Sequence, residues 1–256
     1  MNTKPSFYGH DKPLLCAMIQ CTTAVECIAK IRRSLDAGAD ALGIQMEKIR
    51  PEDRVPDRLR EIFAACDGKP IYVTSYRHSS NAGKTDEELG ETLLEAVDCG
   101  ATLVDVIGDM FDERPKRFEL ATSPEAIEKQ KRLIAEVHRR GGEVLMSCHT
   151  GCDPTLEENL MIARAQIERG ADVVKIVDVA KEKASIPKYI EAIQQITASS
   201  DRKLLFLSSG EGVILRYIGP NFGVCMYLCV ESHGPLDTPQ QPTIARLKAI
   251  RDNILW

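Results

Sequence analysis

Short apolar runs alternate with longer amphipathic stretches along the whole chain. The runs are rich in Val, Ile and Leu and have the length of buried strands rather than helices. The amphipathic stretches carry apolar residues at helical spacing, and several end at a glycine, which accepts the left-handed conformation of a helix C-terminus. This pattern predicts eight strands, at residues 14–20, 41–46, 70–76, 103–109, 143–149, 173–179, 204–210 and 223–230.

The stretches between these strands contain clear signals for helix starts. "TDEE" at Thr85 and "TLEE" at Thr155 are capping boxes, in which the hydroxyl and the third following residue, a glutamate, satisfy each other's backbone N–H groups. "SPEA" places Ser123 at an N-cap and Pro124 at the first helical position. The chain therefore repeats one unit, a strand followed by a helix.

Eight strand–helix units in a chain of 256 residues predict a (β/α)8 TIM barrel. We expect a single domain over residues 1–256, in which residues 1–13 are a short N-terminal extension. A doubly wound open sheet is the alternative. That fold usually has a glycine-rich phosphate turn after its first strand, and "IQCTTAVE" at residues 19–26 is not such a turn.

Amino-acid composition and charge limit which partners this protein can bind and where in the cell it is found. Hydrophobic residues make up 43% and charged residues 28% of the chain, which is ordinary for a soluble protein. A net charge of −5 without a Lys/Arg block argues against a nucleic-acid surface. We find neither an apolar run of the roughly 18 residues that a membrane span needs nor an apolar signal core, so we expect a cytoplasmic protein without a membrane partner. Nine scattered cysteines favour reduced thiols over a disulfide framework.

In a TIM barrel the active site lies at the C-terminal ends of the strands. The polar residues there are the candidates for chemistry. In strand order they are Gln45, Glu47, Tyr76, Arg77, His78, Asp105, Asp109, Ser147, Cys148, His149, Lys175, Asp178, Ser208, Ser209, Glu211 and Arg216.

Lys175 lies in the middle of the apolar run "GADVVKIVDVA". Strand alternation places it on the same face as Val173 and Val177, which could be the barrel interior. A lysine in an apolar pocket loses its proton more easily and can attack a carbonyl to form a Schiff base. A structural ion pair with Asp105 or Asp178, or a side chain reaching outward to solvent, would also explain this lysine.

His149 ends the neighbouring strand, where it could take and return a proton near neutral pH. A hydrogen-bonded structural histidine is the alternative. Arg77 and Arg216 follow strand ends, and arginine suits bidentate binding of a carboxylate or phosphate, although each could be a surface residue. "CHTGC" at residues 148–152 does not match a standard zinc spacing, so we expect no metal.

The motifs "YVTSYR", "VLMSCH", "ADVVKI" and "EGVILRYIGPNFG", in this order on these elements, resemble the type I 3-dehydroquinate dehydratase family. This family is a branch of the class I aldolase-like barrels. The resemblance implies a lyase of the shikimate pathway, and hence of aromatic amino acid biosynthesis, that dehydrates 3-dehydroquinate to 3-dehydroshikimate without a cofactor. It implies that Lys175 is the Schiff-base nucleophile, His149 the general acid and base, and Arg216 the carboxylate binder. Gln241, in "TPQQPTIARL", matches a glutamine that contacts the substrate.

Several positions depart from the family pattern. Gly43 and Gln45 stand where the family carries Glu-x-Arg, which binds substrate hydroxyls, and Asn81 stands where it often has Glu, four residues after Arg77. We therefore expect Gln45 and Arg77 to support substrate binding in an altered way. Asp105 and Asp109 are the strand-four carboxylates that could support His149.

Three other functions stay open at this point. The chain could be a class I aldolase or dehydratase that acts on a different keto acid or keto sugar. It could be a non-catalytic barrel that binds an anion, or a metal-dependent barrel enzyme. For the dehydratase function, the expected partner is a small carboxylated keto substrate. Assembly as a homodimer is possible.

Overall fold

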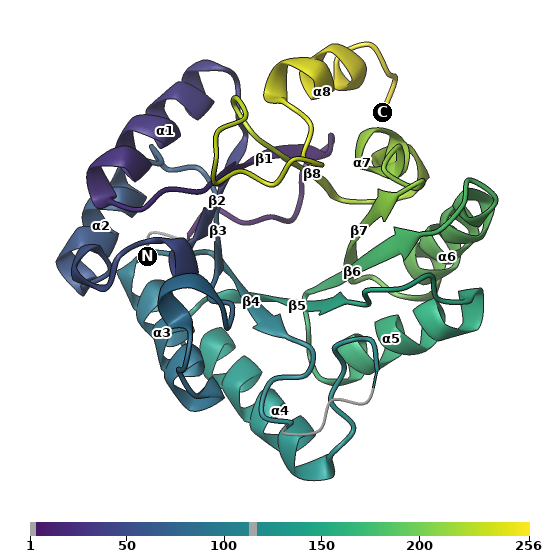
Figure 1. Cartoon of the computed structure of the whole chain (residues 1–256), viewed down its shortest axis with the longest axis horizontal. Coiled ribbons are helices and arrows are strands. Elements are labelled where there is room, and N and C mark those ends of the chain that lie inside the picture. The colour runs from purple at the N-terminus through teal and green to yellow at the C-terminus, as the bar shows by residue number, and fades with distance from the viewer. Residues whose placement is uncertain (1–3, 113–116) are drawn as a thin grey trace. The chain divides into compact units, whose positions relative to one another are not determined.

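The computed structural model of the chain describes residues 4–112 and 117–256. Across these residues eight parallel strands alternate with eight α-helices, so the chain has the predicted (β/α)8-barrel fold (Figure 1). The strand order in the sheet is β7-β6-β5-β4-β3-β2-β1-β8. From β1 to β7, each strand lies next to the strand that follows it in sequence. A helix that connects two parallel strands produces this order.

The strands lie close to the predicted positions. Their bounds are β1 Leu14–Ile19, β2 Ala41–Gln45, β3 Ile71–Thr74, β4 Leu103–Ile107, β5 Glu143–His149, β6 Val173–Ala180, β7 Lys203–Gly210 and β8 Met226–Cys229. The helices are α1 Ala24–Asp36, α2 Pro56–Ala64, α3 Asp86–Cys99, α4 Pro124–Arg139, α5 Leu156–Glu168, α6 Ser185–Ser199, α7 Leu215–Ile218 and α8 Ile244–Arg251. Strands β3, β4 and β8 are shorter than predicted by at least two residues, and β1 and β2 by one.

Contacts group the chain into two compact units, which we describe separately. The first unit comprises Met1–Asp105, Val137–Glu143 and Tyr227–Trp256. The second unit comprises Val106–Glu136 and Val144–Met226. The predicted domain limits, residues 1–256 with an extension over residues 1–13, stay a prediction.

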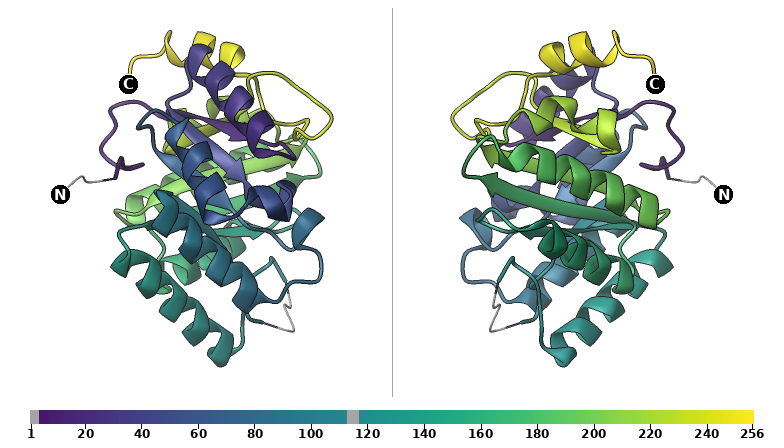
Figure 2. Two further views of the ribbon diagram at one scale, coloured as in Figure 1. Left: turned by 90° about the vertical axis from the view of Figure 1, so that its left-hand side faces the viewer. Right: turned by 90° about the vertical axis from the view of Figure 1, so that its right-hand side faces the viewer.

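The first unit contains β1, β2 and β3 as parallel neighbours, and Met18, Gly43 and Tyr72 lie opposite one another across them. Helices α1, α2 and α3 follow one another side by side, as Figures 1 and 2 show. Helix α8 contacts β1, and Arg251 on this helix forms an ion pair with Asp40. The strands are buried along their whole length, except at the half-buried end of β2.

The second unit contains β5, β6 and β7 in parallel register. Ser147 lies opposite Lys175, which in turn lies opposite Leu205. Helices α5 and α6 pack against each other and contact β6 and β7 respectively, and the right-hand view of Figure 2 shows both helices. The three strands end at the same edge, where His149 is opposite Val177.

The predicted helix starts are present in the structure. Thr85 and Thr155 form complete capping boxes with Glu88 and Glu158. Pro124 is the first residue of α4, and Ser123 precedes it. These starts are determined locally, because a capping box needs only a hydroxyl and a carboxylate three residues apart.

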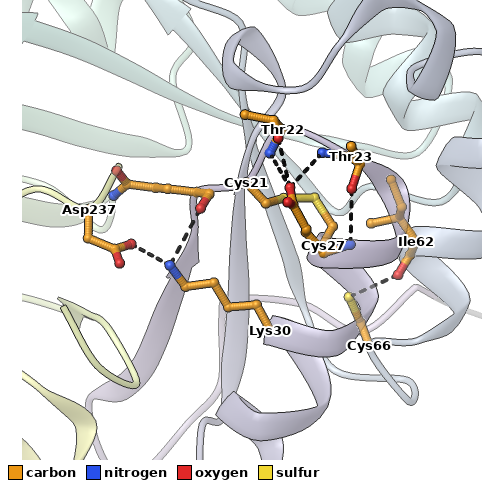
Figure 3. The surroundings of a disulfide bond; sticks show 10 residues. Cys21, Thr22, Thr23, Cys27, Lys30, Ile62, Cys66 and Asp237 are labelled. Atoms are coloured by element: carbon orange, nitrogen blue, oxygen red, sulfur yellow. Dashed lines mark hydrogen bonds and ion pairs between the residues drawn. A yellow bond between two sulfur atoms is a disulfide. The ribbon is translucent and has the colours of Figure 1, made fainter. Parts of the chain in front are cut away.

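The expectation of reduced cysteines is wrong for one pair. Cys21 and Cys27 form a disulfide between the end of β1 and the first turn of α1 (Figure 3). Spacing gave no warning of it, since the two residues approach only when the chain turns from strand into helix. The free thiols include Cys66, Cys99, Cys148, Cys152, Cys225 and Cys229.

Lys30 on α1 binds both the end of β1, at Gln20 O, and the last connection of the first unit, at Asp237. Its Nζ donates to Asp237 Oδ1 at 2.5 Å, and Figure 3 shows the two side chains pointing toward each other.

No helix in the described part of the chain is both long and apolar enough to cross a membrane.

Candidate active site

Lys175 points away from the helices of the second unit. On the neighbouring strand β5, the thiol of Cys148 accepts a hydrogen bond from Gln166 Nε2 of α5 at 3.2 Å, so Cys148 faces the helix layer. Alternation then turns Ser147 and His149 to the other face. Since Lys175 is opposite Ser147 in the ladder, it shares that face.

The backbone of Lys175 is held by one side chain. Gln166 Oε1 accepts from Lys175 N at 3.0 Å, and Gln166 Nε2 donates to Lys175 O at 3.0 Å. Lys175 is 4% exposed and Gln166 is fully buried. Packing and these two hydrogen bonds therefore fix where the lysine side chain starts.

His149 lies within reach of Lys175 on the same face. The two residues are on neighbouring strands and are displaced by two positions, because His149 pairs with Val177. Strand spacing and residue rise place their Cβ atoms roughly 8 Å apart. A substrate atom bound to the lysine amine could therefore be deprotonated by the imidazole.

Glu119 contacts His149, and no pattern in the sequence predicted this contact. Glu119 Oε2 lies 2.7 Å from His149 Nδ1 and accepts from His149 N at 2.8 Å. The sequence suggested Asp105 or Asp109 because both lie on or next to β4. Glu119 comes from the long connection between β4 and α4, where no motif marks it.

Arg216 follows β7 and is 7% exposed. Its Nε donates to Ser208 O at 2.9 Å, which directs the guanidinium toward the end of β7. Burial lowers the pKa of Arg216 to about 10, and no acidic side chain opposes this effect among the described residues. A buried guanidinium without a protein carboxylate is suited to binding an anionic ligand.

Asp178 is not placed to neutralise Lys175, although the sequence allowed that pairing. It lies on the opposite face of β6, where Asn159 Nδ2 and Thr150 Oγ1 donate to its carboxylate at 2.9 and 2.8 Å. Burial raises the pKa of Asp178 to about 7, even though both hydrogen bonds oppose the shift. This carboxyl belongs to the packing between β6 and α5.

In the first unit, the family's glutamate position is occupied by neighbouring side chains. A Cβ at Gly43 would lie 2.3 Å from Met18 Sδ and 3.1 Å from Tyr72 Cδ1. Met18 and Tyr72 are both buried. The packing of β1 and β3 on β2 therefore favours glycine, because a side chain here would require Met18 to move and Tyr72 to shift by a few tenths of an ångström.

Asp105 accepts hydrogen bonds from two tyrosines on and after β3. The Tyr72 hydroxyl donates to Asp105 Oδ2, and the Tyr76 hydroxyl donates to the same oxygen at 2.6 Å. Desolvation, together with the negative charge of Asp105, raises the pKa of Tyr72 well above its usual value, so it remains a donor. Asp105 is thus part of a tyrosine cluster of the first unit.

Gln45 ends β2 with its side-chain oxygen inside the protein. Among the described residues, Gln45 Oε1 is buried and has no hydrogen-bond partner. A buried acceptor that lacks a donor costs free energy. The presence of this unpaired oxygen therefore favours a ligand that donates a hydrogen bond to Gln45. This observation agrees with the predicted substrate contact of Gln45, which stays a prediction.

Arg77 and Asn81 have protein partners in the first unit. Arg77 Nε and Nη2 donate to the two carboxylate oxygens of Asp86, each at 2.8 Å. Asn81 Oδ1 accepts from Arg54 Nη1 at 2.6 Å. The bidentate pair places Arg77 at the start of α3, and its predicted substrate contact stays a prediction.

Gln241 lies against the end of β1. Its Oε1 accepts from Gln20 Nε2 at 3.2 Å, while Gln20 Oε1 accepts from Lys48 Nζ at 2.9 Å. Gln241 is 6% exposed. Gln241 thus attaches the last connection of the chain to Gln20 at the end of β1. Its predicted contact with substrate stays a prediction.

"CHTGC" does not form a metal centre in the structure. Cys148 and Cys152 are free thiols, and burial raises the pKa of Cys148, which disfavours the thiolate that a metal would need. Within the described ranges, no three His, Cys, Asp or Glu side chains are grouped so that they could hold a metal ion.

The fold, the buried lysine and the carboxylate-bound histidine define a (β/α)8-barrel enzyme. A sequence model of the type I 3-dehydroquinases matches residues 15–254. The chain belongs to the type I 3-dehydroquinase family and is a hydro-lyase. A direct search among curated proteins found no match.

Solved structures of similar fold include three bacterial 3-dehydroquinate dehydratases. The type I enzyme of Clostridium difficile is 20% identical, with a TM-score of 0.79 over 95% of this chain and 92% of that one. The Geobacillus kaustophilus enzyme is 17% identical, with a TM-score of 0.80 over 95% and 91%. The Enterococcus faecalis enzyme is 18% identical, with a TM-score of 0.74 over 95% of each chain. At such identities the likeness shows the fold.

Proposed function

We propose that Lys175 of the second unit forms a Schiff base with 3-dehydroquinate and that His149 moves the proton that its dehydration requires. The observation that carries this proposal is the placement of both side chains on one face of neighbouring strands. The family match supplies the reaction, the loss of water from 3-dehydroquinate to give 3-dehydroshikimate. The Clostridium difficile neighbour is described with covalently modified comenic acid, which agrees with covalent chemistry in that protein.

The sequence of steps begins with attack of the Lys175 amine on the ketone. Loss of one water from the adduct leaves a protonated imine, which withdraws electrons from the neighbouring carbon. His149 removes a proton from that carbon, and the electron pair moves into the imine to form an enamine. The enamine then expels the hydroxyl group on the next carbon, which leaves as water after His149 returns the proton.

Hydrolysis of the remaining imine consumes one water and releases the enone and Lys175. One molecule of water is therefore lost overall. Lys175 provides the electron sink, so the scheme routes no step through a metal or organic cofactor.

Arg216 would bind the substrate carboxylate. Its guanidinium is buried, and its Nε donates a hydrogen bond to Ser208 O. This bond fixes the orientation of the two terminal nitrogens. A carboxylate that accepts from those nitrogens would supply the negative charge that the surroundings lack. Replacing Arg216 with methionine should raise KM for a carboxylated substrate by roughly 10- to 100-fold, the value expected for a charged hydrogen bond.

Borohydride trapping tests the Schiff base directly. The protein is incubated with 3-dehydroquinate and reduced, and the mass of the peptide that contains Lys175 is measured. We expect an adduct on this peptide, none in Lys175→Ala, and an unchanged adduct in the control Lys181→Ala, which removes an exposed lysine just beyond β6. His149→Gln should slow turnover while the adduct accumulates.

The outcome separates the alternatives that the sequence left open. An adduct with other keto acids but not with 3-dehydroquinate would keep the chemistry and reject the substrate. Absence of any adduct on Lys175 across such a panel would reject the Schiff-base mechanism and favour an anion-binding barrel.

A different keto acid or keto sugar is the second candidate substrate. The observation that favours it is Gly43, because Met18 and Tyr72 fill the space of the family's hydroxyl-binding glutamate. A cytoplasmic location and a small carboxylated keto partner are also proposals, and assembly as a homodimer stays a prediction.

A further inference from the structure

Glu119 is a carboxylate that the mechanism above does not yet use. A single oxygen, Oε2, contacts His149 twice, at the backbone N over 2.8 Å and at ring Nδ1 over 2.7 Å. The side chains of Glu119 and His149 are 27% and 37% exposed, so both remain accessible at the edge of β5. One atom thus holds both the main chain and the ring of the histidine.

We propose that Glu119 is the positioning residue that sets the tautomer and orientation of His149. An ionised carboxylate only accepts hydrogen bonds, so the neutral imidazole must carry its proton on Nδ1. The lone pair then resides on Nε2, on the side of the ring away from Glu119. This atom becomes the base that removes the substrate proton, and so the inference rests on the proposed function for its catalytic meaning.

The backbone around Glu119 adopts a conformation that its sequence does not favour. Phe118 and Glu119 have φ values of 65° and 52°, in the left-handed region that non-glycine residues rarely adopt. Two contacts hold the segment in place. Cys148 Sγ donates to Glu119 O at 3.2 Å, and Ala121 N donates to Gly108 O at 2.8 Å. Disfavoured backbone that the surroundings maintain is common next to functional groups.

A buried arginine completes this support. Arg169 at the end of α5 donates from Nη2 to Ala121 O at 2.6 Å and from Nη1 to Gly108 O at 3.0 Å. Gln130 on α4 also donates to Gly108 O, at 2.9 Å. The connection that carries Glu119 is therefore bound on both sides, to α4 and to α5.

Gly108 allows the connection to approach β5 closely. A Cβ at this position would lie 2.5 Å from Glu119 O, 2.5 Å from Cys148 Sγ and 2.9 Å from Ser147 O. Because two of these atoms belong to backbone carbonyls, they could not move aside without shifting the chain. The glycine, the arginine and the left-handed residues together bring the carboxylate to His149.

The sequence motifs gave no acid in this place. The family often carries a glutamate four residues after Arg77, whereas this chain has Asn81 there. Asn81 is engaged in the first unit, where it accepts from Arg54 and donates from Nδ2 to Ser75 Oγ at 3.1 Å. Glu119 thus brings a carboxylate to His149 from the connection between β4 and α4, which the residue pattern does not reveal.

The tautomer of His149 tests the inference without any measurement of activity. The chain has five histidines, so ¹⁵N-labelled protein gives few signals, and His149→Gln identifies the one from His149. At a pH where this imidazole is neutral, we expect a proton on Nδ1 in the unaltered protein. A proton on Nε2 would overturn the proposal, and this measurement requires no variant of Glu119.

Kinetics of Glu119→Gln give the second test, with Glu157→Gln as the matched control on the exposed side of α5. We expect kcat for dehydration to fall roughly 100-fold, in the range of general acid–base effects, with little change in KM. The borohydride adduct on Lys175 should still form and accumulate. A deuterium isotope effect at the carbon that loses its proton should increase, because proton removal becomes the slow step.

The positioning role of Glu119 and the Schiff-base function can be refuted separately. If Glu119→Gln keeps full kcat and the tautomer of the unaltered protein, Glu119 does not position His149. If instead the unaltered protein forms no adduct with any keto acid, the proposed function fails, and the tautomer of His149 still decides whether Glu119 orients it.

Discussion

Asp178→Asn should remove a loss of stability that the protein undergoes as pH rises from about 4 to 7. Asp178 is fully buried, and burial raises its pKa to about 7 from an ordinary 3.8. Between these values the native state holds a proton that the unfolded chain releases. The unfolded state is therefore favoured increasingly as pH rises, and stability falls.

The size of this effect follows from the two pKa values. Their difference is roughly three pH units, and each unit corresponds to about 1.4 kcal/mol. The free energy of unfolding should then decrease by roughly 4 kcal/mol across this interval because of Asp178 alone. An asparagine cannot ionise, so the variant should lack this slope.

The structure indicates that asparagine can replace the protonated carboxyl. Thr150 Oγ1 and Asn159 Nδ2 donate to the two oxygens of Asp178, and a hydroxyl can rotate to accept instead. The hydroxyl hydrogen of Thr150 can then turn to the carbonyl oxygen of Cys152 or Val177, each 3.3 Å from Oγ1, while Asn159 Nδ2 still donates to the oxygen of the new side chain. We therefore expect the asparagine to keep both neighbours as hydrogen-bond partners.

Urea unfolding at a series of pH values from 4.5 to 8 provides the assay. The difference in unfolding free energy between Asp178→Asn and the unaltered protein should grow by several kcal/mol in favour of the variant. Glu47, whose pKa burial also raises, contributes equally to both proteins. Asp201→Asn, at a fully exposed site of the same unit, is the control and should show no such growth. Parallel stability curves for Asp178→Asn and the unaltered protein would refute the reasoning.

Three further substitutions test the packing of the strands and connections. Gly43→Glu should lower the melting temperature, because its Cβ would lie 2.3 Å from Met18 Sδ, and dehydroquinate turnover should not increase. Increased turnover would show that Met18 and Tyr72 can move aside. Gly108→Ala should cost about 1–3 kcal/mol of unfolding free energy in urea, since its Cβ would lie 2.5 Å from a backbone carbonyl, and an unchanged midpoint would contradict this. Joint replacement of Cys21 and Cys27 by alanine should cost about 2 kcal/mol by loop entropy, and dithiothreitol should then no longer shift the urea midpoint, as it does in the disulfide form.

The sequence was sufficient for the strands, the helix starts and the face on which Lys175 lies. These features depend on residues close together in the chain: alternation along β6, and a hydroxyl three residues before a glutamate at Thr85 and Thr155. A periodic pattern carries that information because strand and helix each repeat at a fixed spacing. The motifs around His149 and Arg216 resemble those of the family, and such short motifs can be recognised without the structure.

Only the tertiary structure showed which groups meet. Glu119 reaches His149, 30 positions away, because Gly108 and Arg169 direct a connection that has no periodic pattern. Asp178 is separated from Lys175 by the strand itself, although it is three residues away and had the right charge for a pair. Contacts of this kind depend on the path of the chain in space, and side chains far apart in sequence determine that path. Residue types alone therefore indicated the face of β6 on which Lys175 lies, but not the approach of Glu119 to His149.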